Sequence, residues 1–218
     1  DVAALGTSSC ALLEGGRVSC WGHVHSDRTS PDGCSVRPVL TASGEPLRGI
    51  VRLEVGAGID AEGRVWTWRD LSLAPLFHEE SDRPTPEATR ARPVAGLPPA
   101  FDVAVTGAAT FALTGKGALW QIADGELERV AAPRLGRSLA CEYHRCVMAT
   151  DGLLLGWAMP TIESPADLVD GYDVQPRSLA IGRGGCLVDG DATRCWGSAL
   201  WGVVPDADIP TAGLVTVR

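Results

Sequence analysis

The sequence predicts an all-β protein, specifically a β-propeller built of about five four-stranded blades. Three observations predict this fold: a motif that recurs along the chain, a high content of turn residues, and a tryptophan that returns with the motif. The chain has 26 glycines and 15 prolines, and its seven tryptophans outnumber phenylalanine and tyrosine combined. This composition is typical of all-β repeat proteins, in which each repeat supplies one small sheet. With 218 residues and 45% hydrophobic content, the chain can bury a substantial core.

The recurring motif is clearest in residues 6–22, which read GTSSCALLEGGRVSCWG. Two short apolar segments flank a Gly15-Gly16 turn, which is the pattern of a β-hairpin. Related copies occupy residues 51–68, 101–122, 139–157 and 182–197. Each copy ends at a large apolar position, namely Trp21, Trp68, Ile122, Trp157 and Trp196. These positions lie about 44 residues apart on average, the length of one propeller blade, and we expect the tryptophans among them to lie mostly in the core.

The copies divide the chain into five units of a single propeller domain, with boundaries at residues 1–48, 49–99, 100–134, 135–175 and 176–218. Short outer strands are expected at residues 37–40 and 91–94, where a proline is tolerated because it lies at a sheet edge. Residues 213–218 read like the opening of a further unit. We therefore expect the two terminal segments to pair and close the ring; in the alternative, the last strand continues into a sixth unit of a longer protein.

The copies resemble the repeats of the regulator-of-chromosome-condensation family, whose consensus joins V-x-x-V-A-x-G-x-x-H-T-x-A-L to D-G-x-V-x-x-W-G. The resemblance is carried best by LACEYHRCVMATDG in residues 139–152 and by SSCALLEGGRVSCWG in residues 8–22. The family's usual ring has seven blades, whereas this chain shows five. The resemblance implies a binding scaffold, since family members include bacterial secreted propellers that cap enzymes and nuclear exchange factors for small GTPases. The acidic charge and the cysteines of this chain disfavour exchange activity.

Charge excludes some classes of partner. The net charge is -8 and the isoelectric point is about 5.0, and Lys116 is the single lysine. Non-specific affinity for nucleic acid comes from clustered lysine and arginine, so we expect no nucleic-acid partner. No run of 18 uninterrupted apolar residues is present, so no membrane insertion is expected. We expect a monomer that binds another protein.

The cysteines indicate a compartment. Facing positions of a hairpin lie within disulfide reach, and the sequence offers three such pairs. The candidates are Cys10 with Cys20, Cys141 with Cys146, and Cys186 with Cys195, which leaves Cys34 as a free cysteine. Paired cysteines predict an oxidising location, so we expect an extracellular, periplasmic or cell-surface bacterial protein. The alternatives are buried thiols in a reduced cytosolic protein and a zinc site, although neither a C-x₂-C pair nor an H-x₃₋₅-H pair is present.

Candidate binding residues lie in irregular segments. Residues 69–100 form the longest one, and a loop of that length is usually functional or disordered, so Phe77 and His78 are candidates for partner contact. Trp201 replaces a leucine of the family's loop, and His23 and His25 lie in the loop that follows the first hairpin. The alternative for these segments is a solvated insertion without a role. We expect no metal and no cofactor, because the HEE at residues 78–80 lacks the second histidine of a zinc motif.

Catalytic motifs are missing from the sequence. It contains no G-x-S-x-G elbow and no phosphate-binding glycine loop. We therefore expect a protein that is not an enzyme and that binds its partner through loops on a propeller face. One alternative is a hydrolase or lyase with its site in the central channel. It needs acidic residues or histidines on the innermost strands of several units, where valine, alanine, leucine and glycine predominate. A second alternative is a carbohydrate-binding or assembly module of a surface complex that uses Phe77 or Trp201.

Overall fold

The computed structural model describes residues 1–5, 8–22, 36–68, 90–123, 125–132, 134–142, 145–151, 154–158, 168–169, 176–181, 185–189, 192–196 and 215–217. These residues form strands β1 to β20 and one short 3-10 turn, η1 (Glu14–Gly16). The strands make five four-stranded antiparallel sheets, so the predicted all-β blade architecture is confirmed. Within the described residues, no helix is long and apolar enough to span a membrane.

Each sheet is built from one continuous part of the chain. The first two sheets contain β1 (Val2–Leu5), β2 (Ser8–Leu13), β3 (Arg17–Gly22), β4 (Arg37–Pro38), β5 (Ile50–Glu54), β6 (Ala57–Asp60), β7 (Val65–Thr67) and β8 (Arg92–Pro93). The third sheet contains β9 (Ala100–Val105), β10 (Thr110–Thr114), β11 (Ala118–Ala123) and β12 (Glu126–Arg129). The last two contain β13 (Gly136–Glu142), β14 (Arg145–Thr150), β15 (Leu154–Ala158), β16 (Leu168–Val169), β17 (Pro176–Ile181), β18 (Gly185–Asp189), β19 (Ala192–Trp196) and β20 (Val215–Val217).

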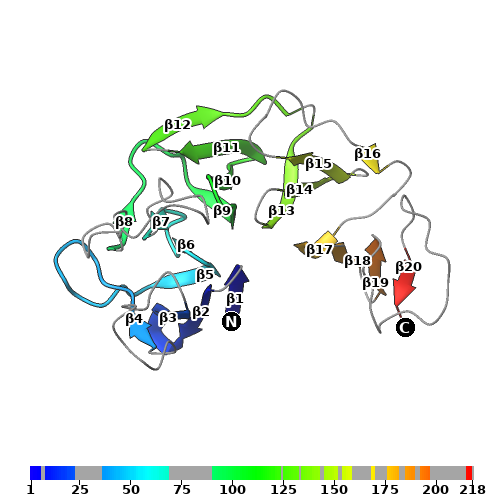
Figure 1. The fold of residues 1–218 in the computed structure, drawn as a ribbon. Coiled ribbons are helices and arrows are strands. Elements are labelled where there is room, and N and C mark those ends of the chain that lie inside the picture. Colours follow the sequence, from blue (N-terminus) through cyan, green and yellow to red (C-terminus); the bar gives the residue numbers. More distant parts are fainter. Residues whose placement is uncertain are drawn as a thin grey trace, which may run out of the picture.

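The sheets follow one another along an arc, and the two chain ends lie at opposite ends of that arc (Figure 1). Neighbouring strands in each sheet are also neighbours in the chain, so every sheet is an up-and-down meander. In Figure 1 the first strand of each sheet lies toward the inside of the arc and the fourth strand lies at its outside. The outer strands β4 and β8 each contain a proline, which has no backbone N–H group. An edge strand tolerates proline because an N–H group on its outer side has no strand to pair with.

The core lies between successive sheets. One apolar cluster joins the first and second sheets, and it includes Val18, Leu53 and Trp68. Two further clusters join the second sheet to the third and the third sheet to the fourth. In the last of these, the rings of Phe111 and Trp157 meet edge to face, with centroids 5.6 Å apart. The first four sheets are therefore held together by apolar faces that they share.

The repeated large apolar positions lie mostly in this core, as the sequence predicts. Trp68, Ile122 and Trp157 are buried, and Trp21 is half-buried. The strands around these positions are also apolar, and every residue of β10 is buried. Burial of both faces explains why the three central residues of β10, Phe111 to Leu113, are all apolar instead of alternating with polar ones.

The expected closure of the ring by its two terminal segments is wrong. Strand β20 pairs antiparallel with β19, where Val217 lies opposite Thr193 and Val215 lies opposite Cys195. Strand β1 pairs with β2 inside the first sheet. The C-terminal strand is thus the fourth strand of the fifth sheet, because β19 would otherwise present an open edge.

Candidate functional site

Several predicted site residues lie outside the described part of the chain. These residues are the candidate contact residues Phe77, His78, Trp201, His23 and His25, together with the candidate free cysteine Cys34. Their role therefore stays a prediction. The described residues contain no group of three or more histidine, cysteine, aspartate or glutamate side chains placed to hold a metal ion.

One face of the arc carries a contact that recurs between successive sheets. The residue that begins an inner strand, or the residue directly before it, donates its backbone N–H to a glycine carbonyl in the hairpin turn of the preceding sheet. The three pairs are Gly49 with Gly15 at 3.2 Å, Ala100 with Gly63 at 2.8 Å, and Gly136 with Gly117 at 2.8 Å. We call this contact the clasp, and we call the side of the arc that carries it the clasp face. The clasp explains the glycines of the repeated turn, because a Cβ atom on Gly16, Gly63 or Gly117 would press against the next sheet.

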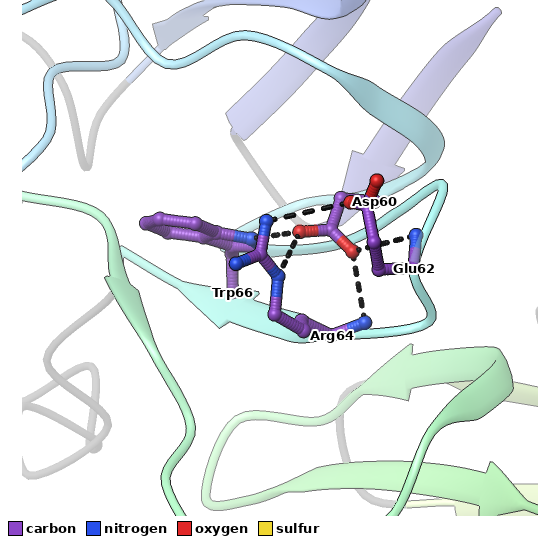
Figure 2. Close-up of polar contacts among 4 residues, drawn as sticks. All are labelled: Asp60, Glu62, Arg64 and Trp66. Carbon is purple, nitrogen blue, oxygen red and sulfur yellow. Dashed lines mark hydrogen bonds and ion pairs between the residues drawn. The ribbon is translucent and has the colours of Figure 1, made fainter.

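The turn of the second sheet shows how a side chain rigidifies this face. The Asp60 carboxylate accepts hydrogen bonds from the backbone N–H of Arg64 at 2.9 Å, from Arg64 Nε at 2.7 Å and from Trp66 Nε1 at 2.9 Å (Figure 2). The backbone N–H of Glu62 donates to the same carboxylate at 3.2 Å. Burial alone would raise the pKa of Asp60, but the hydrogen bonds from Trp66 and Arg64 outweigh it and lower that pKa. The carboxylate therefore holds the exposed Arg64 guanidinium in one position on the clasp face.

Most of the inner strands begin with the same irregularity, a β-bulge in their pairing with the second strand of the sheet. In β5, β9, β13 and β17 the pairing register shifts next to the first residue, so the second residue has no direct partner. A bulge of this kind redirects a side chain. In the first three of these strands the second residue is Val51, Phe101 or Arg137, and all three side chains are exposed. The clasp face therefore presents large side chains from consecutive sheets beside its turns.

Exposed apolar side chains are concentrated on this face. Among the described residues, six large apolar side chains are exposed: Val2, Leu13, Val36, Val51, Phe101 and Leu135. Leu13 lies directly before the turn η1, and Leu135 lies directly before β13. Val51 lies two residues after the clasped Gly49, and Phe101 lies directly after the clasped Ala100. Four of the six therefore belong to the clasp face. Apolar groups gathered on one rigid face indicate a contact surface more than scattered ones do.

Polar side chains connect the inner strands of three sheets. Arg52 Nη2 on β5 lies 2.8 Å from Asp102 Oδ1 on β9. The other carboxylate oxygen, Asp102 Oδ2, accepts the backbone N–H of Leu139 on β13 at 2.8 Å. Asp102 is 1% exposed, and this burial raises its pKa despite Arg52 and the hydrogen bonds. Because both oxygens of Asp102 are already engaged, the arrangement fits a structural tie better than a catalytic acid or base.

A second carboxylate lies beside this tie. Burial first, and then the negative charge of Asp102, raise the pKa of Glu54 to about 7 against the opposing effect of Arg52. Glu54 is half-buried on β5, two residues from Arg52. A carboxyl that titrates near neutral pH can exchange a proton, so this position is where a channel-centred reaction would be sought.

The sequence did not single out Arg52, Glu54 or Asp102, because the inner strands were expected to be mainly apolar. The available signal was the presence of charged residues inside two otherwise apolar openings, VRLEVG and FDVAV. Charges that interrupt an apolar strand need partners, and here the partners lie on the next sheet. A single sequence does not reveal such a pairing between repeats.

Two of the expected cysteine pairs lie at disulfide distance. Cys10 faces Cys20 across β2 and β3 with their Cα atoms 4.0 Å apart. Cys141 faces Cys146 across β13 and β14 with their Cα atoms 4.1 Å apart. Cys186 is also disulfide-bonded, and the residue opposite it in the register is Cys195. These pairs indicate an oxidising compartment.

Comparison with solved structures identifies the architecture. Human WBSCR16 matches with a TM-score of 0.70 and 14% identity, over 100% of this chain and 66% of that chain. Yeast RCC1 (Prp20), in a structure bound to Kap60, matches with a TM-score of 0.62 and 20% identity, over 100% and 60% of the two chains. The chain folds as an RCC1-type β-propeller. A further structure of Prp20 from Saccharomyces cerevisiae, described with its binding to Gsp1p and histones, matches with a TM-score of 0.60 and 18% identity, over 100% and 63%.

The likeness is one of fold. This RCC1-type propeller spans between 60% and 66% of the length of those three chains. No protein-family model matches the sequence, and no curated protein matches it. The fold hosts many functions, so function has to be argued from the clasp face and from the loops.

Proposed function

We propose that this RCC1-type propeller is a non-catalytic scaffold, secreted or exposed on a cell surface, that binds a protein partner through loops and side chains on a propeller face. The observation that carries the proposal is the concentration of exposed large apolar side chains on the clasp face. The clasps and the Asp60 hydrogen bonds hold that face rigid, so binding there would order few groups and cost little conformational entropy. The disulfide-distance cysteine pairs support an oxidising location.

The fold neighbours support the class of partner. Yeast Prp20 is described as bound to Kap60 and as binding Gsp1p and histones, all of which are proteins. For the present chain a chromatin partner is disfavoured, because a net charge of -8 does not suit a chromatin-binding surface. The candidate contact residues Phe77, His78, Trp201, His23 and His25 belong to this proposal as loop contacts that supplement the rigid face.

Affinity capture tests the proposal. The full chain is immobilised and exposed to the secretions and surface extract of its source. A variant with residues 73–90 replaced by a Gly/Ser linker tests the long loop, and a variant with residues 23–35 replaced in the same way tests the loop that carries His23 and His25. We expect the full chain to retain one protein stoichiometrically. The amount retained should fall when one of the two loops is replaced. Retention of no protein would contradict the proposal and would favour glycan arrays and hydrolase screens as tests of the two alternatives.

The channel-centred enzyme is kept as a second candidate because of Glu54. Its pKa of about 7 and its position on an inner strand are properties of a general acid or base. A panel of hydrolase and lyase substrates, assayed with the native protein and with Glu54→Gln, decides this point. Turnover that is lost in Glu54→Gln would replace the scaffold proposal.

A further inference from the structure

The third and fourth sheets carry an excess of positive charge on the clasp face. Four cationic side chains and one carboxylate lie there: Lys116 in the turn before β11, Arg129 and Arg134 at a shared pocket, and Arg137 paired with Asp151. We call these five residues, together with Leu135 and Phe101, the basic patch. The chain as a whole has a net charge of -8, so this local excess runs against the overall charge. A reversal of charge on a rigid face points to a specific contact more than to a requirement for solubility.

Two of these cations are free to bind a partner. Lys116 and Arg129 have no hydrogen-bond or ion-pair partner for their side chains within the described part of the chain. Arg137 holds Asp151 with two hydrogen bonds, from Nε to Oδ1 at 2.9 Å and from Nη2 to Oδ2 at 2.8 Å. This pairing lowers the pKa of Asp151, so the carboxylate stays charged and keeps Arg137 in place. The positive charge that no carboxylate pairs therefore lies at Lys116 and Arg129, which have no partner among the described residues, and at Arg134, whose guanidinium donates only to the backbone carbonyl of Asp151.

A pocket opens between these cations. Its volume is about 240 Å³, and its lining includes Leu119, Arg129, Arg134 and Leu135. Pockets for drug-sized ligands usually measure roughly 300–1,000 Å³, so this one suits one or two side chains of a protein better than a cofactor. Leu135 is 52% exposed at its rim and Leu119 is buried in its wall. The pocket thus combines an apolar surface from Leu119 and Leu135 with two arginines, Arg129 and Arg134.

The patch is held in position by the fold. Gly117, in the turn that bears Lys116, is clasped to Gly136 by the 2.8 Å backbone hydrogen bond. Arg134 Nη1 donates to the carbonyl of Asp151 at 3.2 Å, which fixes the link between the third and fourth sheets to the next turn. Hot-spot residues act best when they are rigid before the partner arrives.

We propose that the basic patch binds an acidic segment of the protein partner, with one apolar side chain in the pocket beside Leu135 and carboxylates on Arg129 and Arg134. This inference rests on the proposed function, because it assumes that the partner is a protein. It deepens that proposal by assigning the contact to the third and fourth sheets and by naming the chemistry of the segment. Carboxylates suit arginine because the guanidinium fork donates two parallel hydrogen bonds.

Binding of synthetic peptides to the full oxidised chain tests the inference. The probe is a fluorescent twelve-residue peptide library with a central leucine flanked by glutamate and aspartate, compared with matched libraries flanked by lysine or by serine. We expect the acidic library to bind tightest and its affinity to fall about tenfold between 50 and 200 mM salt. Equal binding of the acidic and serine libraries, or tighter binding of the lysine library, would overturn the proposal.

Charge-reversal variants locate the contact. Arg129→Glu/Arg134→Glu should weaken binding of the acidic library about tenfold or more, and Leu135→Ser should weaken it about fivefold or more. The matched control Arg48→Glu/Arg92→Glu changes the charge equally at two exposed arginines, Arg48 in the link before β5 and Arg92 on β8, and it should change affinity less than about twofold. Unfolding midpoints within a degree of the parent show that each variant is folded. Unchanged binding by Arg129→Glu/Arg134→Glu sinks the inference.

Two further arms separate the competing outcomes. Binding of a twenty-nucleotide oligothymidine that competes with the peptides and is lost in Arg129→Glu/Arg134→Glu would assign the patch to nucleic acid and overturn the proposal. If affinity capture retains a protein equally with the parent and with this variant, the scaffold function stands and the patch inference fails. If the acidic library binds the patch while capture retains no protein, the scaffold function fails independently of the patch.

Discussion

Glu54 shows how a position on an inner strand changes the behaviour of a carboxyl group. Its pKa is raised from 4.5 to about 7, first by burial and then by the charge of Asp102, while Arg52 opposes the rise. The folded state therefore holds this proton more tightly than the unfolded state. The stability contributed by the protonated form is complete below the unfolded pKa of 4.5 and is lost as the pH rises through about 7. At alkaline pH the folded state carries the cost of a half-buried charge.

Glu54→Gln should remove this cost. We expect the variant and the parent to unfold at the same temperature at pH 4.5. At pH 8 the variant should unfold at a higher temperature, with a gain in unfolding free energy of about 1–3 kcal/mol at most. Thermal unfolding followed by circular dichroism at the two pH values measures the difference. Glu126→Gln, at an exposed position on β12, is the matched control and should behave alike at both values. A Glu54→Gln variant that is equally destabilised at both pH values would show that the folded state requires the charged carboxylate.

Sequence patterns predict individual residues only where one repeat contains the whole interaction. The buried Trp68 and Trp157 and the facing cysteines of each hairpin followed from positions inside one unit. The Arg52–Asp102 pair spans two units, and its members are an arginine and an aspartate at the same place in successive copies. Within a single repeat, such a charged residue looks like a departure from the consensus. Its ion-pair partner is recognised only when the structure places the next sheet beside it.

At the level of elements, the clasp links each hairpin turn to the next sheet. The sequence pattern predicted the glycine-rich hairpin turns, but it did not predict their contact with the next sheet. Two constraints act on Gly117: its φ of +103° is rare for residues with a side chain, and a Cβ atom there would meet the backbone of Gly136. The turn and the start of β13 are therefore in backbone contact. The contact was not predictable from local turn chemistry, because it depends on how tightly two sheets approach.

Substitution at two glycines of this turn separates the constraints. Gly117→Ala should destabilise the protein by about 2–3 kcal/mol, because it adds backbone strain and breaks the clasp. Gly115→Ala should cost about 1 kcal/mol, because its φ of +53° carries the strain alone and open space surrounds the new Cβ atom. Chemical denaturation of both variants measures the two values. Equal losses would mean that the clasp contributes nothing beyond the conformation of the turn.

At the scale of the whole molecule, the sheets form an arc in which each apolar cluster is shared by two neighbours. The repeat period predicted this architecture because a blade cannot bury both of its faces alone. The order of the strands at the chain ends was not predictable from the period. The apolar segment at residues 215–217 fits either an inner or an outer strand by composition, and the free edge of β19 decides between them.

In such an arc, the stability of each sheet should depend mainly on the sheets next to it. Phe111→Ala removes a ring from the cluster between the third and fourth sheets, where it contacts Trp157. We expect a loss of about 3–5 kcal/mol, with hydrogen-exchange protection reduced in β9–β15 and retained in β1–β4. Val18→Ala, in the cluster between the first and second sheets, should reduce protection in β1–β8 and leave β13–β15 protected. Hydrogen exchange with peptide-level mass spectrometry reads both variants. Uniform loss across all sheets in either variant would mean that the arc unfolds as one cooperative unit, and the coupling would then extend beyond the shared apolar clusters to the inner-strand tie of Arg52, Asp102 and Leu139.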